Sequence, residues 1–131
     1  MSRLAGALAV AVLLIACEST APPPSVDPGD AASVLAAYLV ALESGDCDAG
    51  RALAAPTFRR GNGELCGAVR VGAIKVDWNP ARSATEVVYA TTLTTSGSAD
   101  GSIPAGDVTW FFDLQRDATG AWRLAGGGSG P

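Results

Sequence analysis

A run of thirteen apolar residues, from Leu4 to Ala16, ends at a cysteine, Cys17. A helix needs about 20 apolar residues to cross a bilayer, so this run is too short for a permanent membrane span. It has the length of the apolar part of a secretory signal, and Arg3 supplies the positive charge that precedes such a segment. The sequence therefore predicts that residues 1–16 are removed on export, which leaves 115 of the 131 residues to fold outside the cytoplasm.

The residues around the predicted cleavage point, Leu14-Ile15-Ala16-Cys17, resemble a bacterial lipobox. The resemblance implies cleavage just before Cys17 and a diacylglyceryl group on its sulfur. Two long acyl chains hold a protein stably at a membrane, because each buried methylene contributes about 0.8 kcal/mol. The alternative is an ordinary signal peptide, which leaves an unexplained cysteine at the new terminus. The lipobox predicts a protein anchored through Cys17 at the outer, extracytoplasmic face of the cell membrane.

A linker is expected between the anchor and the folded part. Residues 17–29 include Pro22-Pro23-Pro24, and consecutive prolines favour an extended chain of about 3.1 Å per residue. A docking motif for a proline-binding domain is the alternative to a spacer. The sequence thus predicts a tether over 17–29, one domain over 30–126, and a flexible tail over the glycine-rich residues 127–131.

The charge and the absence of histidine exclude several functions. The chain has nine basic and thirteen acidic residues, so losing Arg3 with the signal leaves eight against thirteen, a net charge of −5. Nucleic-acid and anionic-lipid surfaces need clustered Lys and Arg, so neither partner is expected. With no histidine there is no Ser-His-Asp triad, no Cys-His dyad and no imidazole metal site. We expect no catalytic residues, no cofactor and no metal.

The three cysteines also indicate export. If Cys17 carries lipid, Cys47 and Cys66 remain as an even pair with 18 residues between them. A disulfide closing such a loop contributes on the order of 3 kcal/mol, and an exported domain has oxidant available. Two free buried thiols are the alternative. The sequence predicts a Cys47–Cys66 disulfide.

The first half of the predicted domain has helical periodicity. A helix is expected to begin at Asp27, followed by Pro28 at its first position, or at Asp30. It should end at Gly45. Its apolar face contains Val34, Leu35, Tyr38, Leu39 and Leu42. Asp46 can cap a second, shorter helix that runs to Ala54, before Pro56 prevents continuation.

The second half has the alternation of strands. Strands are expected over 69–78, 86–95, 108–115 and 122–124, with a turn at 117–120 between the last two. The alternation in the first of these slips at Gly72-Ala73, which predicts a β-bulge. Helices followed by an antiparallel meander predict an α+β fold, with the helices packed on one face of a curved sheet.

This order of elements resembles the nuclear transport factor two-like family, whose domain is a cone. The resemblance covers residues 28–126 and lies in the helix 31–46 and the closing strand Gly120-Ala121-Trp122-Arg123-Leu124. Its members include small actinobacterial lipoproteins of unassigned role, ketosteroid isomerase, polyketide cyclases and domains of penicillin-binding proteins. The cyclase-like relatives often use an Asp-His pair, which this chain lacks. Fold alone does not choose among these functions.

Four residues are candidates for a cavity or an interface. Tyr38 and Trp110 belong to a set of aromatic residues that would line a cone cavity, with core packing as the alternative. Phe111 alternates to the face opposite Trp110 and suggests an interface with another copy. Asp113 is a candidate because it places a carboxylate in a strand rich in aromatic residues. The alternative is that its side chain simply faces solvent, as every second residue of such a strand does. An isomerase-like base and oxyanion donor could come from Asp77, Asp113, Tyr38 and Tyr89, but none matches a family motif position.

Three functional hypotheses follow from these residues. The first is a non-enzymatic envelope domain that binds a protein partner or a second copy as a homodimer. The second is a carrier or sensor of a small apolar ligand in the cone cavity. The third is an isomerase- or dehydratase-like enzyme that uses Asp113 or Asp77.

Overall fold

The fold consists of two helices and one four-stranded sheet. The structure, a computed structural model, describes residues 26–130, so the predicted signal, Cys17 and most of the tether lie outside the described residues. The elements are α1 (Ala31–Ser44), α2 (Cys47–Arg51), β1 (Val71–Val76), β2 (Glu86–Ser96), β3 (Ala105–Arg116) and β4 (Trp122–Gly128). The strands form one antiparallel sheet in the order β1-β2-β3-β4. The predicted α+β class is confirmed.

Helix α1 begins at the second of the two predicted caps. The side chain of Asp30 accepts a hydrogen bond from the Ser33 amide at 3.3 Å, which satisfies one of the free donors of the first turn. Asp27 instead closes the preceding turn, where its side chain accepts from the Gly29 amide at 2.8 Å. The interpretation of Asp27 as the cap, with Pro28 in the helix, is therefore wrong. Gly45, with φ of 75°, ends the helix as predicted.

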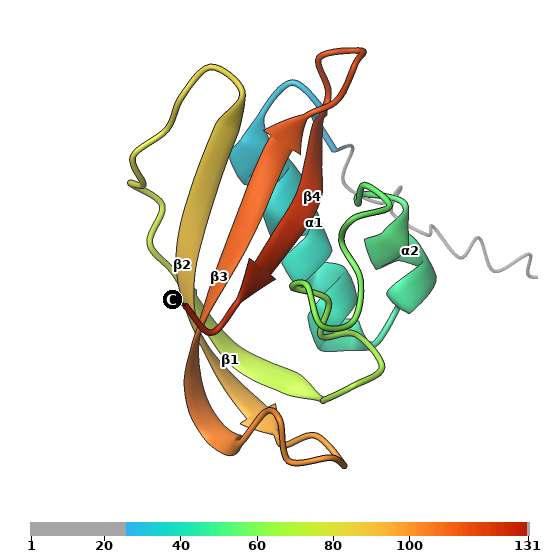
Figure 1. Cartoon of the computed structure of the whole chain (residues 1–131), viewed down its shortest axis with the longest axis vertical. Coiled ribbons are helices and arrows are strands. Elements are labelled where there is room, and N and C mark those ends of the chain that lie inside the picture. Colours follow the sequence, from blue (N-terminus) through green and yellow to red (C-terminus); the bar gives the residue numbers. More distant parts are fainter. Residues whose placement is uncertain (1–25, 131) are drawn as a thin grey trace, which may run out of the picture.

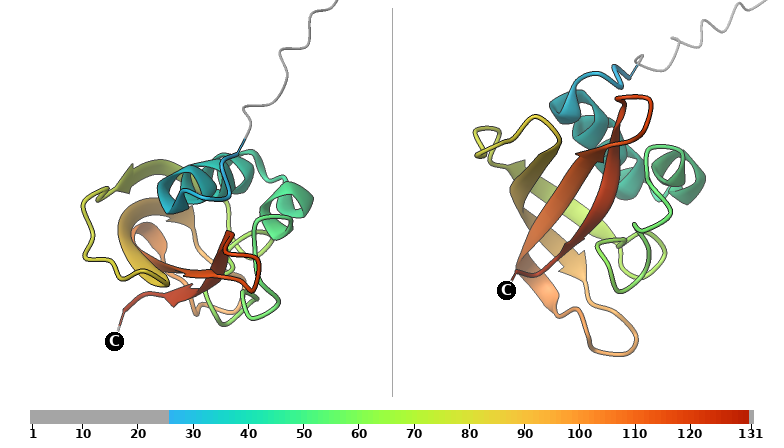
Figure 2. Two further views of the ribbon diagram at one scale, coloured as in Figure 1. Left: turned by 90° about the horizontal axis from the view of Figure 1, so that it is seen from above. Right: turned by 45° about the horizontal axis from the view of Figure 1, so that its top comes forward.

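One face of α1 forms the core with one face of the sheet (Figures 1 and 2). The residues predicted to face inward are all buried: Val34, Leu35, Tyr38, Leu39 and Leu42. They pack in one cluster with buried side chains of β2, β3 and β4. Burying an apolar side chain of this size stabilises the fold by about 1.5–3 kcal/mol, so this face holds α1 on the sheet. No helix within residues 26–130 is long and apolar enough to span a membrane.

Helix α2 is shorter than predicted. Asp46 caps it, as expected, by accepting from the Ala49 amide at 3.1 Å. The helix ends at Arg51 because the chain beyond it bonds to β4 instead. The Leu124 amide donates to the Leu53 carbonyl at 3.0 Å, and the Ala55 amide donates to the Leu124 carbonyl at 2.7 Å. This short parallel pairing covers part of the outer edge of β4.

The predicted disulfide joins the start of α2 to the loop before β1. Cys47 and Cys66 are bonded, with their Cα atoms 5.6 Å apart. The alternative of two free thiols is therefore wrong. The bond fixes the otherwise irregular segment 59–68, called the 59–68 loop below, against the helical side of the molecule.

The predicted bulge lies in β1. Gly72 pairs with Thr94 but Lys75 pairs with Thr92, so β1 has an extra residue in this interval. Ala73 has a φ of 45°, in the left-handed region. The bulge makes this edge strand irregular, and Lys75 adds a charge to it. Both features discourage pairing with other chains.

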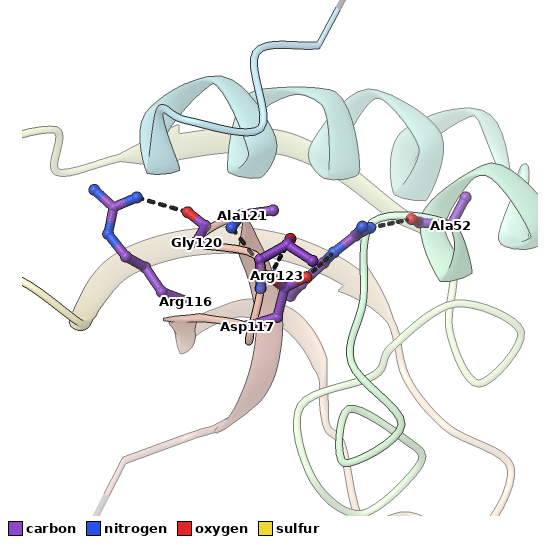
Figure 3. Close-up of polar contacts among 7 residues, drawn as sticks. Ala52, Arg116, Asp117, Gly120, Ala121 and Arg123 are labelled. Carbon is purple, nitrogen blue, oxygen red and sulfur yellow. Dashed lines mark hydrogen bonds and ion pairs between the residues drawn. The ribbon is translucent and has the colours of Figure 1, made fainter.

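A polar network fixes the turn between β3 and β4 (Figure 3). Asp117 accepts from the Thr119 hydroxyl at 2.6 Å and from the Ala121 amide at 3.0 Å. The Thr119 hydroxyl is the main reason that the pKa of Asp117 lies near 2. Arg123 donates to Asp117 at 3.3 Å and to the Ala52 carbonyl at 2.8 Å, so the turn is tied to the end of α2.

The glycines at the end of the chain belong partly to the sheet. Gly127 and Gly128 pair with Phe112 and Phe111 and form the end of β4. The prediction that these two residues belong to a flexible tail is therefore wrong. Because glycine has no side chain, the backbone of another segment can lie directly on theirs. A Cβ atom on Gly63 would lie 2.7 Å from backbone atoms of Gly126 and Gly127. The 59–68 loop therefore packs backbone to backbone on the glycines of β4.

Candidate functional site

The candidate site is the face of the sheet that the helices leave uncovered. The register of β2 and β3 places Val88 opposite Asp113 and Ala90 opposite Phe111, so these four residues share one face. Phe111 and Asp113 are half-buried, and Val88 is 40% exposed. We call Val88, Ala90, Phe111 and Asp113 the outer patch. The side chain of Phe111 thus points to the face of the sheet opposite that of the buried Phe112, as the alternation predicted.

The outer patch is hollow because β4 adds no side chains beside it. The residues of β4 that pair with Asp113 and Phe111 are Gly126 and Gly128. A pocket of about 310 Å³ lies along this glycine strand and is lined by Val88, Phe111 and Asp113 together with glycines of β4 and Gly130. The glycines therefore have two effects: they admit the 59–68 loop, and they place no side chain beside Phe111, whose ring lies close to the backbone of Gly130.

Asp113 is the chemically distinctive residue of the outer patch. Its Oδ2 atom accepts from the Gln115 side chain at 3.0 Å, whereas its Oδ1 atom is buried and has no hydrogen-bond partner within residues 26–130. Burial raises the pKa of Asp113; the Gln115 bond lowers it in part, and the nearby negative charge of Glu86 raises it again, so the pKa lies above its ordinary value. A buried acceptor without a donor costs about 1–3 kcal/mol. A donor brought by another molecule would remove that cost.

Tyr38 does not belong to the outer patch. It is fully buried in the core, where its ring contacts Phe58 and Phe112 edge to face with centroids 5.3 and 5.5 Å apart. Its hydroxyl donates to Glu64 Oε1 at 2.5 Å. Burial and this bond to a carboxylate both raise the pKa of Tyr38. The aromatic interior that was a candidate cavity is packed here with side chains.

Trp110 occupies a third position, at the end of the sheet near the β2–β3 hairpin. Its indole Nε1 donates to the Gly63 carbonyl at 3.1 Å, and the ring lines a pocket of about 450 Å³. The four residues proposed from the sequence therefore lie in three places: Tyr38 in the core, Trp110 at this pocket, and Phe111 and Asp113 on the outer patch.

Glu64 and the glycines of β4 gave no usable sequence signal for their roles in these sites. Glu64 lies in the 59–68 loop, for which the sequence predicts no element, yet it is the acceptor for Tyr38 across 26 residues. Gly127 and Gly128 suggested only a flexible tail, and nothing in the sequence marked Gly126 as a contact for the loop. Both roles depend on contacts between distant segments, so no local pattern could have indicated them.

The geometry of the predicted acid residues does not assemble an isomerase-like site. Asp77 is exposed, and its side chain accepts from the Asn79 amide at 3.0 Å, which closes a turn. The hydrogen bond of Asp113 is with Gln115, and within residues 26–130 the tyrosine hydroxyls bond to Glu64 and Arg82 instead. Within the described part of the chain, no three His, Cys, Asp or Glu side chains gather as metal ligands.

Comparisons of the chain with family models, with curated proteins and with solved structures found no match.

Proposed function

We propose that this chain is a lipid-anchored protein of the bacterial cell envelope whose nuclear transport factor two-like domain is a non-enzymatic binding module. Two observations support the location. The lipobox Leu14-Ile15-Ala16-Cys17 follows an apolar run of signal length. The Cys47–Cys66 disulfide is typical of a protein in an oxidising compartment.

The observation that carries the binding role is the outer patch. Apolar Phe111 and Val88 lie on a face that no element of residues 26–130 covers, next to Asp113 Oδ1, which has no hydrogen-bond partner among those residues. Surface patches that combine an aromatic anchor with a half-buried polar group are typical of protein interfaces. The partner that fits is a protein that brings an apolar side chain to Phe111 and a hydrogen-bond donor to Asp113.

The charge of the domain favours a basic partner over a second copy. After loss of Arg3 with the signal, eight basic residues oppose thirteen acidic ones. Asp113 and Glu86 carry the same sign at the patch itself. Two copies facing each other there would bring four carboxylates together, whereas an Arg or Lys donor would be attracted and would satisfy Oδ1.

The experiment is site-specific photo-crosslinking in intact cells. A photoreactive residue replaces Val88, at the rim of the patch, and the adducts are separated by mass. We expect one adduct with another protein, lost in a Phe111→Glu variant because the charge is repelled by Asp113 and fills the apolar hollow. The matched control is Val40→Glu, which changes another exposed valine, 66% accessible, on α1.

The outcomes separate the hypotheses. An adduct that persists in Phe111→Glu, with the disulfide and the thermal unfolding unchanged, contradicts binding at the patch. An adduct of twice the chain mass replaces the partner with a second copy. An adduct lost equally in Val40→Glu shows that the effect of charge is not local.

A further inference from the structure

The pocket that contains Trp110 is built from three segments that are distant in the sequence. One wall is the 59–68 loop, the second is the β2–β3 hairpin over 98–103, and the third is the end of β4. Figure 1 shows the hairpin as the orange loop at the lower end of the sheet. The volume of the pocket, about 450 Å³, is within the range of small-molecule sites, roughly 300–1,000 Å³. No part of the proposed function uses this pocket.

Trp110 gives the pocket one fixed aromatic side chain. The bond from its Nε1 atom to the Gly63 carbonyl at 3.1 Å sets the orientation of the indole. The ring is half-buried and packs partly on the core, so it does not need to be ordered by a ligand. An indole surface of this kind suits a ligand with an apolar side and a polar rim.

Two carboxylates of the pocket are held by the protein through a single oxygen each. Glu64 Oε1 accepts from the Tyr38 hydroxyl and from the Cys66 amide at 2.8 Å. Asp100 Oδ1 accepts from the hydroxyls of Ser98 at 2.7 Å and Ser102 at 2.6 Å. Within residues 26–130 no hydrogen bond uses the second oxygen of either group. Each carboxylate is oriented and keeps an acceptor for a ligand.

The charges around the pocket decide between ligand classes. The Ser102 hydroxyl lowers the pKa of Asp100 to about 2, so this group is an anion at neutral pH. Two carboxylates disfavour phosphates and other anions. Arg60 lies in the same lining and offsets one of the negative charges, which weakens the attraction for a cation. Arg60 also supplies donors, so donors and acceptors surround the tryptophan.

We propose that this pocket binds a neutral saccharide of one or two units. The apolar C–H face of a sugar ring can lie against Trp110, while its hydroxyl groups donate to Glu64 and Asp100 and accept from Arg60. A sugar ring is an uncharged ligand that offers an apolar face together with several hydroxyl groups at its rim. The inference depends neither on the lipid anchor nor on the outer patch.

The test uses the three tryptophans as internal reporters. The full chain, ¹⁵N-labelled and purified in detergent with its disulfide intact, is titrated with maltose, cellobiose and N,N′-diacetylchitobiose. We expect the indole N–H signal of Trp110 to shift saturably with at least one of them, with a Kd on the order of 1 mM. The signals of Trp78 and Trp122, which lie outside the pocket lining, should stay in place.

Variants connect the shift to the pocket. Asp100→Ala removes a carboxylate on an exposed hairpin and should weaken binding by about tenfold, because a hydroxyl group of the sugar loses its charged acceptor. Glu64→Gln keeps an acceptor for Tyr38 and should weaken binding less. Glu43→Gln, on α1 and outside this lining, is the matched control and should bind as the unaltered chain does.

Each contrary result overturns the proposal. If no sugar moves the Trp110 signal, the pocket does not bind saccharides. If only tetramethylammonium moves it, the pocket is a cation site. If a sugar shifts Trp110 equally in Asp100→Ala and in the unaltered chain, with the other amide signals of both proteins superimposed, the sugar binds without the acceptor that defines the proposed site.

Discussion

At the scale of single residues, Tyr38 connects the core to the 59–68 loop. Its hydroxyl, inside the core, donates to Glu64, and the same Glu64 oxygen accepts the Cys66 amide. A Tyr38→Phe variant keeps the ring contacts with Phe58 and Phe112 but removes the donor. We expect the free energy of unfolding to fall by about 2 kcal/mol, because a hydrogen bond to a charged, half-buried group is lost. Urea unfolding measures this change.

The matched control is Tyr89→Phe. Tyr89 is equally buried, but among the residues that the structure describes its hydroxyl makes only a 3.4 Å contact with the Arg82 side chain. Removing this hydroxyl should change the free energy of unfolding by less than about 1 kcal/mol. Equal losses in the two variants would show that Glu64 does not stabilise the protein through Tyr38.

The carboxyl of Asp113 predicts a particular dependence of stability on pH. Burial raises its pKa in the folded chain, and Glu86 raises it further, so the folded state binds this proton more tightly than the unfolded chain. The free energy of unfolding therefore falls as pH rises from the unfolded pKa, about 3.9, through the raised folded pKa, and stays lower above it. Asp113→Asn should remove this loss.

The measurement is the difference in Tm between Asp113→Asn and the unaltered chain across pH. We expect the variant to melt a few degrees higher at neutral pH, and the difference to shrink as pH falls below the folded pKa. Taking the difference should remove the opposite contributions of Asp100 and Asp117, whose pKa values of about 2 are set by hydrogen bonds that do not involve Asp113. A difference in Tm that is constant with pH would contradict titration of Asp113 as its cause.

At the scale of elements, the contact between the 59–68 loop and β4 depends on Gly63. A Cβ atom there would lie 2.7 Å from backbone atoms of Gly126 and Gly127 and from the Phe58 ring, and φ at Gly63 is +101°. The backbone of β4 cannot move away without disturbing its pairing with β3. Gly63→Ala should therefore lower the free energy of unfolding by about 3 kcal/mol or more, measured by urea unfolding.

Gly61→Ala separates the two effects that act at Gly63. Gly61 also has a positive φ, +84°, but a Cβ atom there would meet nothing within 4 Å. The free energy of unfolding of Gly61→Ala should therefore fall by the backbone strain alone, about 1 kcal/mol. If both variants lost the same stability, the close approach between the loop and β4 would contribute nothing.

The elements that the sequence predicted well are those whose apolar residues repeat regularly. The buried face of α1, the bulge at Gly72-Ala73 and the alternation of β2 and β3 follow directly from such repeats. Strand ends were missed where side chains are small or absent: β3 begins at Ala105 rather than 108, and β4 continues to Gly128. There the backbone pairing continues although the pattern of apolar side chains has stopped.

The candidate sites were less predictable than the fold. Alternation alone put Phe111 and Asp113 on the face opposite Phe112, and counting cysteines gave the disulfide. The hollow beside Phe111 could not be foreseen, because it depends on which residues of β4 pair with β3. The same holds for the Glu64 acceptor and for the hairpin that brings Asp100 to Trp110.

At the scale of the whole molecule, different cysteines serve the proposed anchoring and the folding. Cys47 and Cys66 are bonded to each other inside the domain, so neither has a free thiol to carry lipid. Cys17 alone follows the lipobox residues. If the proposed function is right, lipid attachment and folding can therefore be removed separately, each by a substitution that leaves the other intact.

Cys17→Ala tests the anchor. Cells grown with an alkyne-tagged fatty acid should label the unaltered chain and not this variant, because the variant has no sulfur to accept the diacylglyceryl group. The double variant Cys47→Ala with Cys66→Ala is the matched control. It should keep its label, while its free energy of unfolding falls by about 3 kcal/mol, the contribution expected of a disulfide that closes a loop of this length.

Label that persists in Cys17→Ala, or an unlabelled chain cut after Ala16, would favour an ordinary signal peptide and a released domain. The outer patch would then meet its partner in solution, and binding could not depend on the stable membrane attachment that two acyl chains provide.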